Sequence, residues 1–214
     1  MQRLSPEGVP KGSIMQLNTE TLGPQQAPSG VYNPATKETL FAWQSGFIFN
    51  PPVPGSLSVW ARRIGANGEP IGNDFRVPRS MDTLSSFPNV ATDLAGNYFF
   101  VYQEDDQTTI ETWPGGQFLS PDGTFLGQDL QLNSYDPGAK LGPSIAGPLD
   151  DGTYLVAWSS TASPGDDDSL EGVVARVWRG PPAPALAIPA ANTKALLGLA
   201  LLIASAALWL LRRR

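Results

Sequence analysis

The side chains of this sequence best suited to chemistry are carboxylates, which gather in two short runs. The first run is Glu104, Asp105 and Asp106, and the second spans residues 166–171. Paired carboxylic groups can serve as the acid and nucleophile of a glycosidase, and several carboxylate oxygens can bind Ca²⁺. Neither run has the spacing of an EF-hand loop, so both can equally be solvated acidic loops. We assign no catalytic residue, and keep as Ca²⁺ candidates Asp166, Asp167 and Asp168.

Whole classes of mechanism are excluded because the sequence contains neither cysteine nor histidine. Without them there is no disulfide, no thiolate nucleophile, no Cys/His zinc site and no histidine-based triad. Residues 1–193 carry 10 basic and 20 acidic side chains, because the other four basic residues are Lys194 and Arg212 to Arg214. An acidic body argues against a nucleic-acid partner, whose phosphates require Lys and Arg. We therefore expect no enzyme, no nucleic acid and no cofactor apart from the possible Ca²⁺.

One pattern of glycine, proline and aromatic residues occurs three times along the body. The stretches RLSPEGVPKGSIMQLN, RIGANGEPIGNDFRVP and FLSPDGTFLGQDLQLN align without gaps. A proline follows twenty residues after the first shared glycine, and an apolar run with a large aromatic residue follows the proline. These positions predict an internal repeat: Gly8, Gly68 and Gly123; Gly12, Gly72 and Gly127; Pro28, Pro88 and Pro143; Trp43, Tyr102 and Trp158.

Each repeat has the composition of two hairpins. SPDG and LDDG are turn sequences, and runs such as YFFVY and YLVAW are rich in strand-forming residues. Four strands in a unit of this length are typical of a propeller blade. The predicted fold is all-β, with repeated four-stranded antiparallel units in a β-propeller-like arrangement of about three blades, plus one C-terminal transmembrane helix. The equivalent Trp43 and Trp158 are expected in the core.

The predicted domains follow from the repeat. Residues 1–178 form the propeller-like domain, with units of about 3–58, 59–113 and 114–171 and a returning strand at 172–178 that pairs beside the N-terminal unit. Three blades are fewer than propellers usually have, and MQRLSPEGVP is not a signal peptide. The alternatives are an open stack of units and a truncated form of a longer array, and we favour truncation.

These units resemble the repeats of large bacterial surface and secreted proteins, in which a "dGxfvvvW" strand is followed by a turn-rich hairpin. The counterparts here are DGTYLVAWSS and VWARRIGANGEPIGNDFRV. The resemblance covers residues 2–178. It implies a propeller-like surface module and does not imply a reaction.

The C-terminal stretch is the most apolar of the chain. Residues 195–211 carry no charge, and a helix of 17 residues would span about 26 Å. The three arginines that follow, Arg212, Arg213 and Arg214, should stay in the cytoplasm. We predict a Pro/Ala-rich linker with a sorting motif at 179–193 and a single-pass membrane helix at 194–214, with the N-terminus outside, the C-terminus in the cytoplasm and the lipid bilayer as partner.

This tail resembles the PEP-CTERM group of sorting signals, most of all its IPTL variety, in which a short proline motif precedes an apolar helix and an arginine cluster. Ile188 and Pro189 match the motif, while Ala190 and Ala191 replace its Thr and Leu. The resemblance implies recognition by an exosortase-type enzyme of a Gram-negative bacterium, with cleavage near the motif.

Two functions remain open on the sequence alone. The first is a non-enzymatic protein of the inner membrane or cell envelope that displays the repeat domain to an unknown extracellular ligand. The alternative is a carbohydrate-binding or carbohydrate-acting module, suggested by the acidic runs and by the tryptophans at positions 43, 60, 113, 158 and 178.

Overall fold

Every regular element in the described part of the chain is a β-strand. The structure, a computed structural model, describes residues 1–21, 23–47, 56–106, 109, 111–134, 138–149, 152–161 and 171–180. Within these ranges there are thirteen strands and no helix. Neighbouring strands pair antiparallel throughout, as in hairpins whose turns are short. The predicted all-β class is therefore confirmed.

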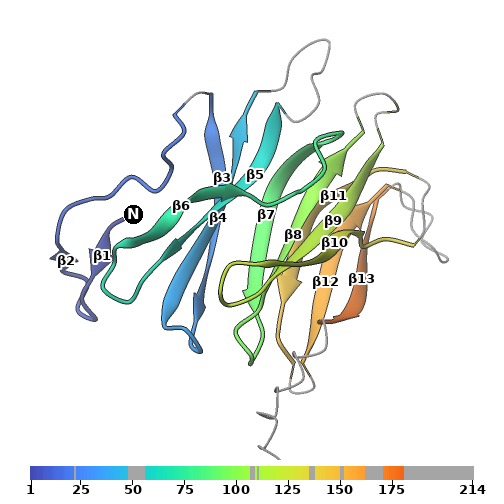
Figure 1. The fold of residues 1–214 in the computed structure, drawn as a ribbon. Coiled ribbons are helices and arrows are strands. Elements are labelled where there is room, and N and C mark those ends of the chain that lie inside the picture. The colour runs from blue at the N-terminus through green and yellow to red at the C-terminus, as the bar shows by residue number, and fades with distance from the viewer. Residues whose placement is uncertain are drawn as a thin grey trace, which may run out of the picture. The chain divides into compact units, whose positions relative to one another are not determined.

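The strands form four separate sheets, which follow one another along the chain (Figure 1). The N-terminal hairpin consists of β1 (Arg3–Leu4) and β2 (Pro10–Lys11). The first blade consists of β3 (Gln25–Asn33), β4 (Glu38–Gly46), β5 (Leu57–Ile64) and β6 (Pro70–Arg76). The second consists of β7 (Leu84–Thr92), β8 (Tyr98–Asp105), β9 (Thr112–Leu119) and β10 (Phe125–Gln131). The third consists of β11 (Lys140–Ala146), β12 (Thr153–Ser160) and β13 (Gly172–Arg179).

The predicted turns join neighbouring strands. In the SPDG turn between β9 and β10, the Gly123 N–H donates to the Ser120 carbonyl at 3.0 Å, and the Ser120 N–H donates to the Thr124 carbonyl at 2.8 Å. Gly123 has a φ of +93°, a conformation that side-chain-bearing residues rarely adopt. The sequence SPDG thus closes a tight hairpin for the reason that its composition indicated.

The blade and the sequence repeat are offset by two strands. The predicted unit boundaries at 58 and 113 fall inside β5 and β9, which pair along their length with β4 and β8. Each repeat therefore supplies the outer hairpin of one blade and the inner hairpin of the next. Equating one repeat with one blade was wrong, because strand pairing continues across the long β4–β5 and β8–β9 connections.

The strand expected at 172–178 is present as β13, but its partner differs from the prediction. It pairs with β12 from Thr153↔Arg179 to Ser160↔Gly172, and not with the N-terminal hairpin. In position it matches β5 and β9, the third strands of the other blades. Among the described residues, the third blade therefore has three strands where the other two have four.

Successive blades pack face to face, and we name the two sides of a blade by their contacts. The A face of a blade contacts the next blade along the chain, and the B face contacts the preceding one. The first interface packs small aliphatic residues of the first blade against aromatic residues of the second, and all are fully buried: Leu40, Ala42, Val59 and Ala61 against Tyr98, Phe100 and Tyr102. Such burial of apolar area is the main stabilising contribution to the domain.

The second interface is more aromatic. The rings of Phe99 and Phe118 stack with centroids 3.9 Å apart, and Tyr154 of the third blade meets Phe99 edge-on at 5.2 Å. The edge-on orientation is one that aromatic rings favour. Trp158 lies in this cluster and Trp43 in the equivalent strand of the first blade, each 5% exposed. The core position predicted for these two tryptophans is confirmed.

The C-terminal predictions fall almost entirely outside the described residues. The predicted linker at 179–193 is described only at Arg179, which ends β13, and Gly180, whereas Ile188, Pro189, the helix at 194–214 and Arg212 to Arg214 all lie beyond Gly180. In the part that the structure describes, no helix is long and apolar enough to span a bilayer.

Candidate functional site

The inner strands of the three blades, β3, β7 and β11, lie next to one another and share one irregularity. The pairing register shifts between Gln26 and Ser29 in β3, between Ser86 and Asn89 in β7, and at the equivalent place in β11. A register shift of this kind is a β-bulge, which turns side chains out of the regular ladder. The three bulges contain the repeated prolines at positions 28, 88 and 143.

The residue before each proline has a left-handed backbone conformation. Ala27 and Phe87 have a φ of +49°, and Gly142 has a φ of +56°. A non-glycine residue in this region costs about 1–3 kcal/mol, so the surroundings must hold it there. The previous blade supplies a contact: the Phe87 N–H donates to Gln44 Oε1 at 3.1 Å, and the Gly142 N–H donates to Gln103 Oε1 at 3.2 Å. The bulges of β7 and β11 are therefore fixed by equivalent glutamines.

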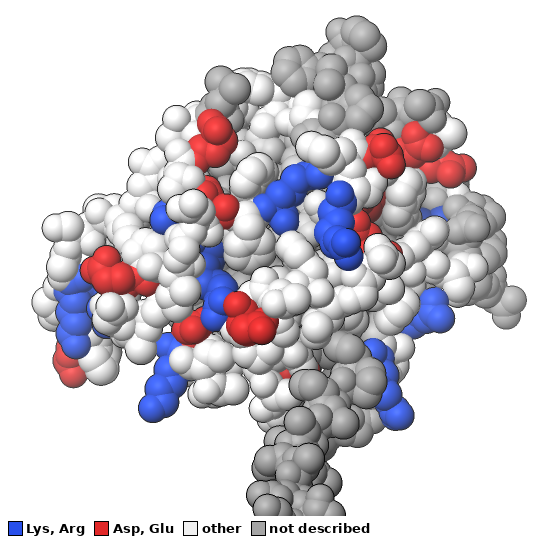
Figure 2. All heavy atoms as spheres, viewed as in Figure 1, with Lys and Arg blue, Asp and Glu red and all other residues white. Residues whose placement is uncertain are grey.

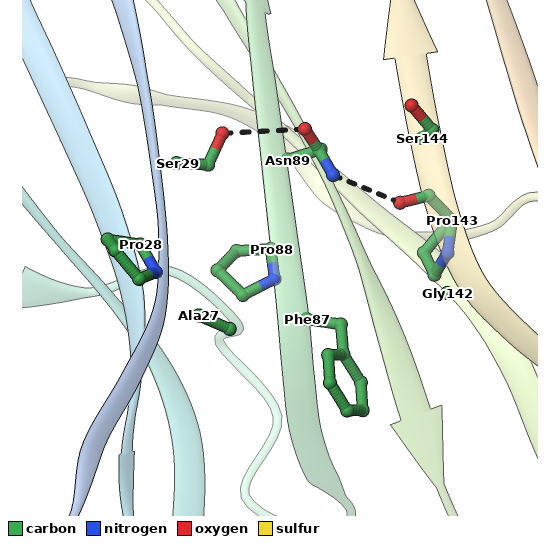
Figure 3. A pocket seen from close by; sticks show the side chains of 9 residues that line it. All are labelled: Ala27, Pro28, Ser29, Phe87, Pro88, Asn89, Gly142, Pro143 and Ser144. Carbon is green, nitrogen blue, oxygen red and sulfur yellow. Dashed lines mark hydrogen bonds between the residues drawn. The ribbon is translucent and has the colours of Figure 1, made fainter.

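The three bulges line a cavity of about 320 Å³, which we call the inner-strand cavity (Figure 3). Asn89 lies at its middle and connects all three blades. The Ser29 hydroxyl donates to Asn89 Oδ1 at 3.4 Å, and Asn89 Nδ2 donates to the Pro143 carbonyl at 3.3 Å. The ring of Phe87 is 50% exposed. The lining is formed by Ala27, Pro28, Ser29, Phe87, Pro88, Asn89, Gly142, Pro143 and Ser144.

The chemistry of this lining is neutral. Hydroxyl and amide groups of Ser29, Asn89 and Ser144 offer donors and acceptors, and Phe87 and the prolines offer flat apolar surfaces. None of the described lining residues is ionisable. Such a surface can hydrogen-bond and stack on an uncharged polar molecule, but it offers no acid or base for proton transfer.

A second cavity of about 200 Å³ surrounds Glu104, the first member of the predicted acidic run. Glu104 is 6% exposed, and its Oε2 accepts hydrogen bonds from the hydroxyls of Thr83 and Ser85, the latter at 3.0 Å. Burial raises the pKa of Glu104 to about 7, although these hydrogen bonds oppose the shift. The described lining is Ser80, Thr83, Glu104, Trp113, Asp129, Leu130 and Gln131.

Two further residues, Asp129 and Trp113, determine the chemistry of this second cavity. Asp129 accepts the backbone N–H groups of Arg79 and Ser80, both at 2.9 Å, and its negative charge also raises the pKa of Glu104. Trp113 is half-buried and lies directly opposite Glu104 in the β8–β9 pair. A protonatable carboxyl, a second carboxylate and an indole ring therefore meet in one pocket.

The other predicted site residues are not gathered there. Asp105 is half-buried, and burial raises its pKa. Asp106 follows β8, and its N–H donates to the Glu111 carbonyl at 2.9 Å. The Ca²⁺ candidates Asp166 to Asp168 lie outside the described residues. Within the described ranges, no group of three or more acidic side chains is placed to hold a metal ion.

The inner-strand cavity was not predicted from the sequence. Its signal was the repeated proline, which the alignment contained at positions 28, 88 and 143, each followed by a serine or asparagine. The distribution of surface charge does not indicate a site in the way that the repeated prolines do. Figure 2 shows acidic and basic side chains interspersed over the viewed face, among larger areas of uncharged residues.

Comparison with known proteins places the fold. No family model matches the chain, and no curated protein matches its sequence. Its structure is similar to that of an endo-arabinase from Bacteroides thetaiotaomicron VPI-5482, with a TM-score of 0.52 and 10% identity over 83% of this chain and 64% of that one. It also matches an N-acetylgalactosamine deacetylase from F. plautii, with a TM-score of 0.44 and 14% identity over 72% of this chain and 48% of that one.

The chain thus spans less than two thirds of the length of both of these proteins. Together with the four antiparallel sheets, the likeness to the endo-arabinase defines the class of the fold as β-propeller-like. At this identity the likeness concerns the fold alone.

Proposed function

We propose that the chain is a non-enzymatic binding protein of the bacterial cell envelope, in which the blades bind an uncharged polar ligand of the oligosaccharide class. The neutral lining of the inner-strand cavity carries this proposal. An oligosaccharide presents hydroxyls that pair with Ser29, Asn89 and Ser144, and C–H faces that stack on Phe87. The lack of an ionisable group in the described lining favours binding over hydrolysis.

Display outside the inner membrane is the second half of the proposal. It rests on the apolar residues 195–211, on Arg212 to Arg214 and on the match of Ile188 and Pro189 to a sorting motif. An exosortase-type enzyme is the expected partner of that motif. Fractionation of cells that express the chain with and without residues 188–214 tests this half, and recovery of both forms in the cytosol would contradict it.

A glycan array probed with the full chain tests the binding half. Asn89→Ala removes the amide that faces Ser29 and Pro143, and Phe87→Ala removes the exposed ring while keeping a residue type that Ala27 shows to be compatible with the left-handed φ. Both variants should lose binding. Leu94→Ala, at an exposed turn position away from this lining, is the control.

A second candidate function is glycoside cleavage at the Glu104 cavity. Its support is the pKa of about 7 of a buried carboxyl that shares a pocket with Asp129 and Trp113, since a general acid needs a pKa near the working pH. A hydrolase screen compares the full chain with Glu104→Gln. Turnover abolished by this change would favour the enzyme, and binding without turnover in both proteins would favour the binding protein.

A further inference from the structure

The A face of the third blade is apolar and open to solvent. Leu155, Val173 and Val177 are 41%, 81% and 59% exposed. The pairs Leu155↔Val177 and Ala157↔Ala175 place these side chains on one side of β12 and β13. A contiguous apolar surface of this kind usually marks an interaction site.

The first blade shows what covers such a face. At four register positions its A face has the same residue types, and there all four are fully buried in the interface with the second blade. At two other positions the types differ, because Val177 corresponds to Arg63 and Ser159 corresponds to Gln44. The equivalent pairs are Leu40 and Leu155, Ala42 and Ala157, Val59 and Val173, and Ala61 and Ala175. At these four positions the exposed surface therefore repeats a surface that this chain buries against an aromatic B face.

Among the described blades, the first has a B face that no other described blade contacts. Tyr32 is 58% exposed, and Phe41 and Trp60 are half-buried. The pairs Tyr32↔Thr39 and Trp43↔Trp60 place all three rings on one side of the blade. Of these, Phe41 corresponds to Phe100 of the second blade, while Trp43, which corresponds to Tyr102, is only 5% exposed. The N-terminal segment covers only part of this side, where Arg62 Nη1 donates to the Leu17 carbonyl at 2.6 Å.

We propose that the A face of the third blade packs on the B face of the first blade of a second copy of this chain. Because the two surfaces differ, the contact is head to tail, and two such contacts close a ring of two copies. Two sets of the three described blades give six, which lies within the usual range of four to eight for propellers. The two sets of inner strands would then face one axis, so both copies would contribute to the wall of the inner-strand cavity.

Sedimentation velocity of the full chain in a mild detergent tests this pairing. The wild-type chain should be a dimer. Val173→Asp on the A face and Tyr32→Asp on the B face should each weaken the dimer by about tenfold or more, because each would bury an unpaired charge. Leu94→Asp, at a 77% exposed apolar position in the β7–β8 turn, is the matched control and should leave the dimer unchanged.

A mixing experiment distinguishes head-to-tail contact from other dimers. A mixed pair of the Val173→Asp and Tyr32→Asp chains has one contact free of both substitutions, so mixing the two monomeric variants should restore dimers. Circular dichroism and the melting temperature of each variant show that it is folded. A wild-type monomer, an open-ended series of oligomers, a dimer insensitive to Tyr32→Asp, or a mixture that stays monomeric would each overturn the proposal.

Discussion

The guanidinium of Arg63 reaches from the first blade into the second, where Nη2 donates a 2.6 Å hydrogen bond to the carbonyl of Pro121. The same Nη2 lies 2.8 Å from the Glu38 carboxylate, and the Arg63 side chain is only 13% exposed. Arg3 makes the equivalent contact from the N-terminal hairpin to the Asn67 carbonyl of the first blade. A charged donor thus ties the N-terminal hairpin to a turn of the first blade, and another ties the first blade to a turn of the second.

Replacement of Arg63 should loosen this junction. Arg63→Ala removes a charge-assisted hydrogen bond and leaves Glu38 without its partner, so the free energy of unfolding should fall by about 2–3 kcal/mol. Arg63→Lys keeps the charge but not the forked geometry, and should lose less. Urea denaturation measures both. Equal stability of Arg63→Ala and the wild-type chain would contradict a structural role for the Pro121 contact.

Glu104 should make the protein more stable in mild acid than at neutral pH. The pKa of Glu104 is about 7 in the folded protein, against the ordinary 4.5. Between pH 4.5 and 7, the folded protein therefore keeps a proton on Glu104 that the unfolded chain has released. The resulting contribution to the free energy of unfolding is complete below about pH 4.5 and is lost as the pH rises to 7, a change of about 3 kcal/mol. Asp105, whose pKa burial also raises, acts in the same direction.

The test is a series of denaturation curves from pH 4.5 to 8. Glu104→Gln should flatten most of the pH dependence, because it keeps the shape of the side chain and removes its titration. Glu111→Gln, at an exposed position beyond β8, serves as the control and should reproduce the wild-type slope. A wild-type stability that rises between pH 4.5 and 7 would contradict the neutral, buried state of Glu104.

Glycine at position 27 should stabilise the chain. Ala27 has a φ of +49°, and glycine adopts this conformation without the steric cost of a Cβ atom. Ala27→Gly should raise the free energy of unfolding by about 0.5–1 kcal/mol, despite the added entropy of the unfolded chain. Ala42→Gly, in a buried strand of the same blade, should lower it by about 1 kcal/mol. A loss of stability in both variants would show that the bulge carries no strain.

The buried amide of Asn33 should also prove costly to remove. It is fully buried, its Nδ2 donates to the Gly96 carbonyl of the second blade at 2.8 Å, and its Oδ1 accepts the Ala35 N–H at 3.1 Å. Asn33→Ala leaves both backbone groups unpaired, so thermal unfolding should show a loss of about 1–3 kcal/mol. Asn67→Ala, whose Oδ1 accepts a hydrogen bond at an exposed turn, should lose less.

Composition and repeat were enough to predict the class of fold. Strand-forming runs such as YFFVY, turn sequences such as SPDG and the equivalence of Trp43 and Trp158 all reflect local preferences and burial, which a sequence carries directly. The blade boundaries could not be obtained in this way, because a hairpin at residues 63–72 has the same pattern whichever neighbour its first strand pairs with. Which neighbour the first strand of that hairpin pairs with depends on pairing across the β4–β5 connection.

The two candidate sites also differ in how far the sequence indicated them. Glu104 belongs to a conspicuous acidic run, so its chemistry was noticed. Its burial, however, depends on residues outside β8: Thr83, which precedes β7, Ser85 of β7 and Trp113 of β9. The inner-strand cavity consists of small neutral residues that no motif describes. Ser29, Asn89 and Ser144 become a site only because three bulges bring them together.

The two-strand offset between repeat and blade has a consequence for how such a chain can change length. Because every repeat begins in one blade and ends in the next, unequal recombination between two repeats would delete or insert about one blade without creating a new kind of junction. Each remaining blade would still receive its outer hairpin from one repeat and its inner hairpin from the previous one, as the first blade now receives β5–β6 and β3–β4. Arrays with different numbers of blades are therefore reachable by single genetic steps that leave every strand pair intact.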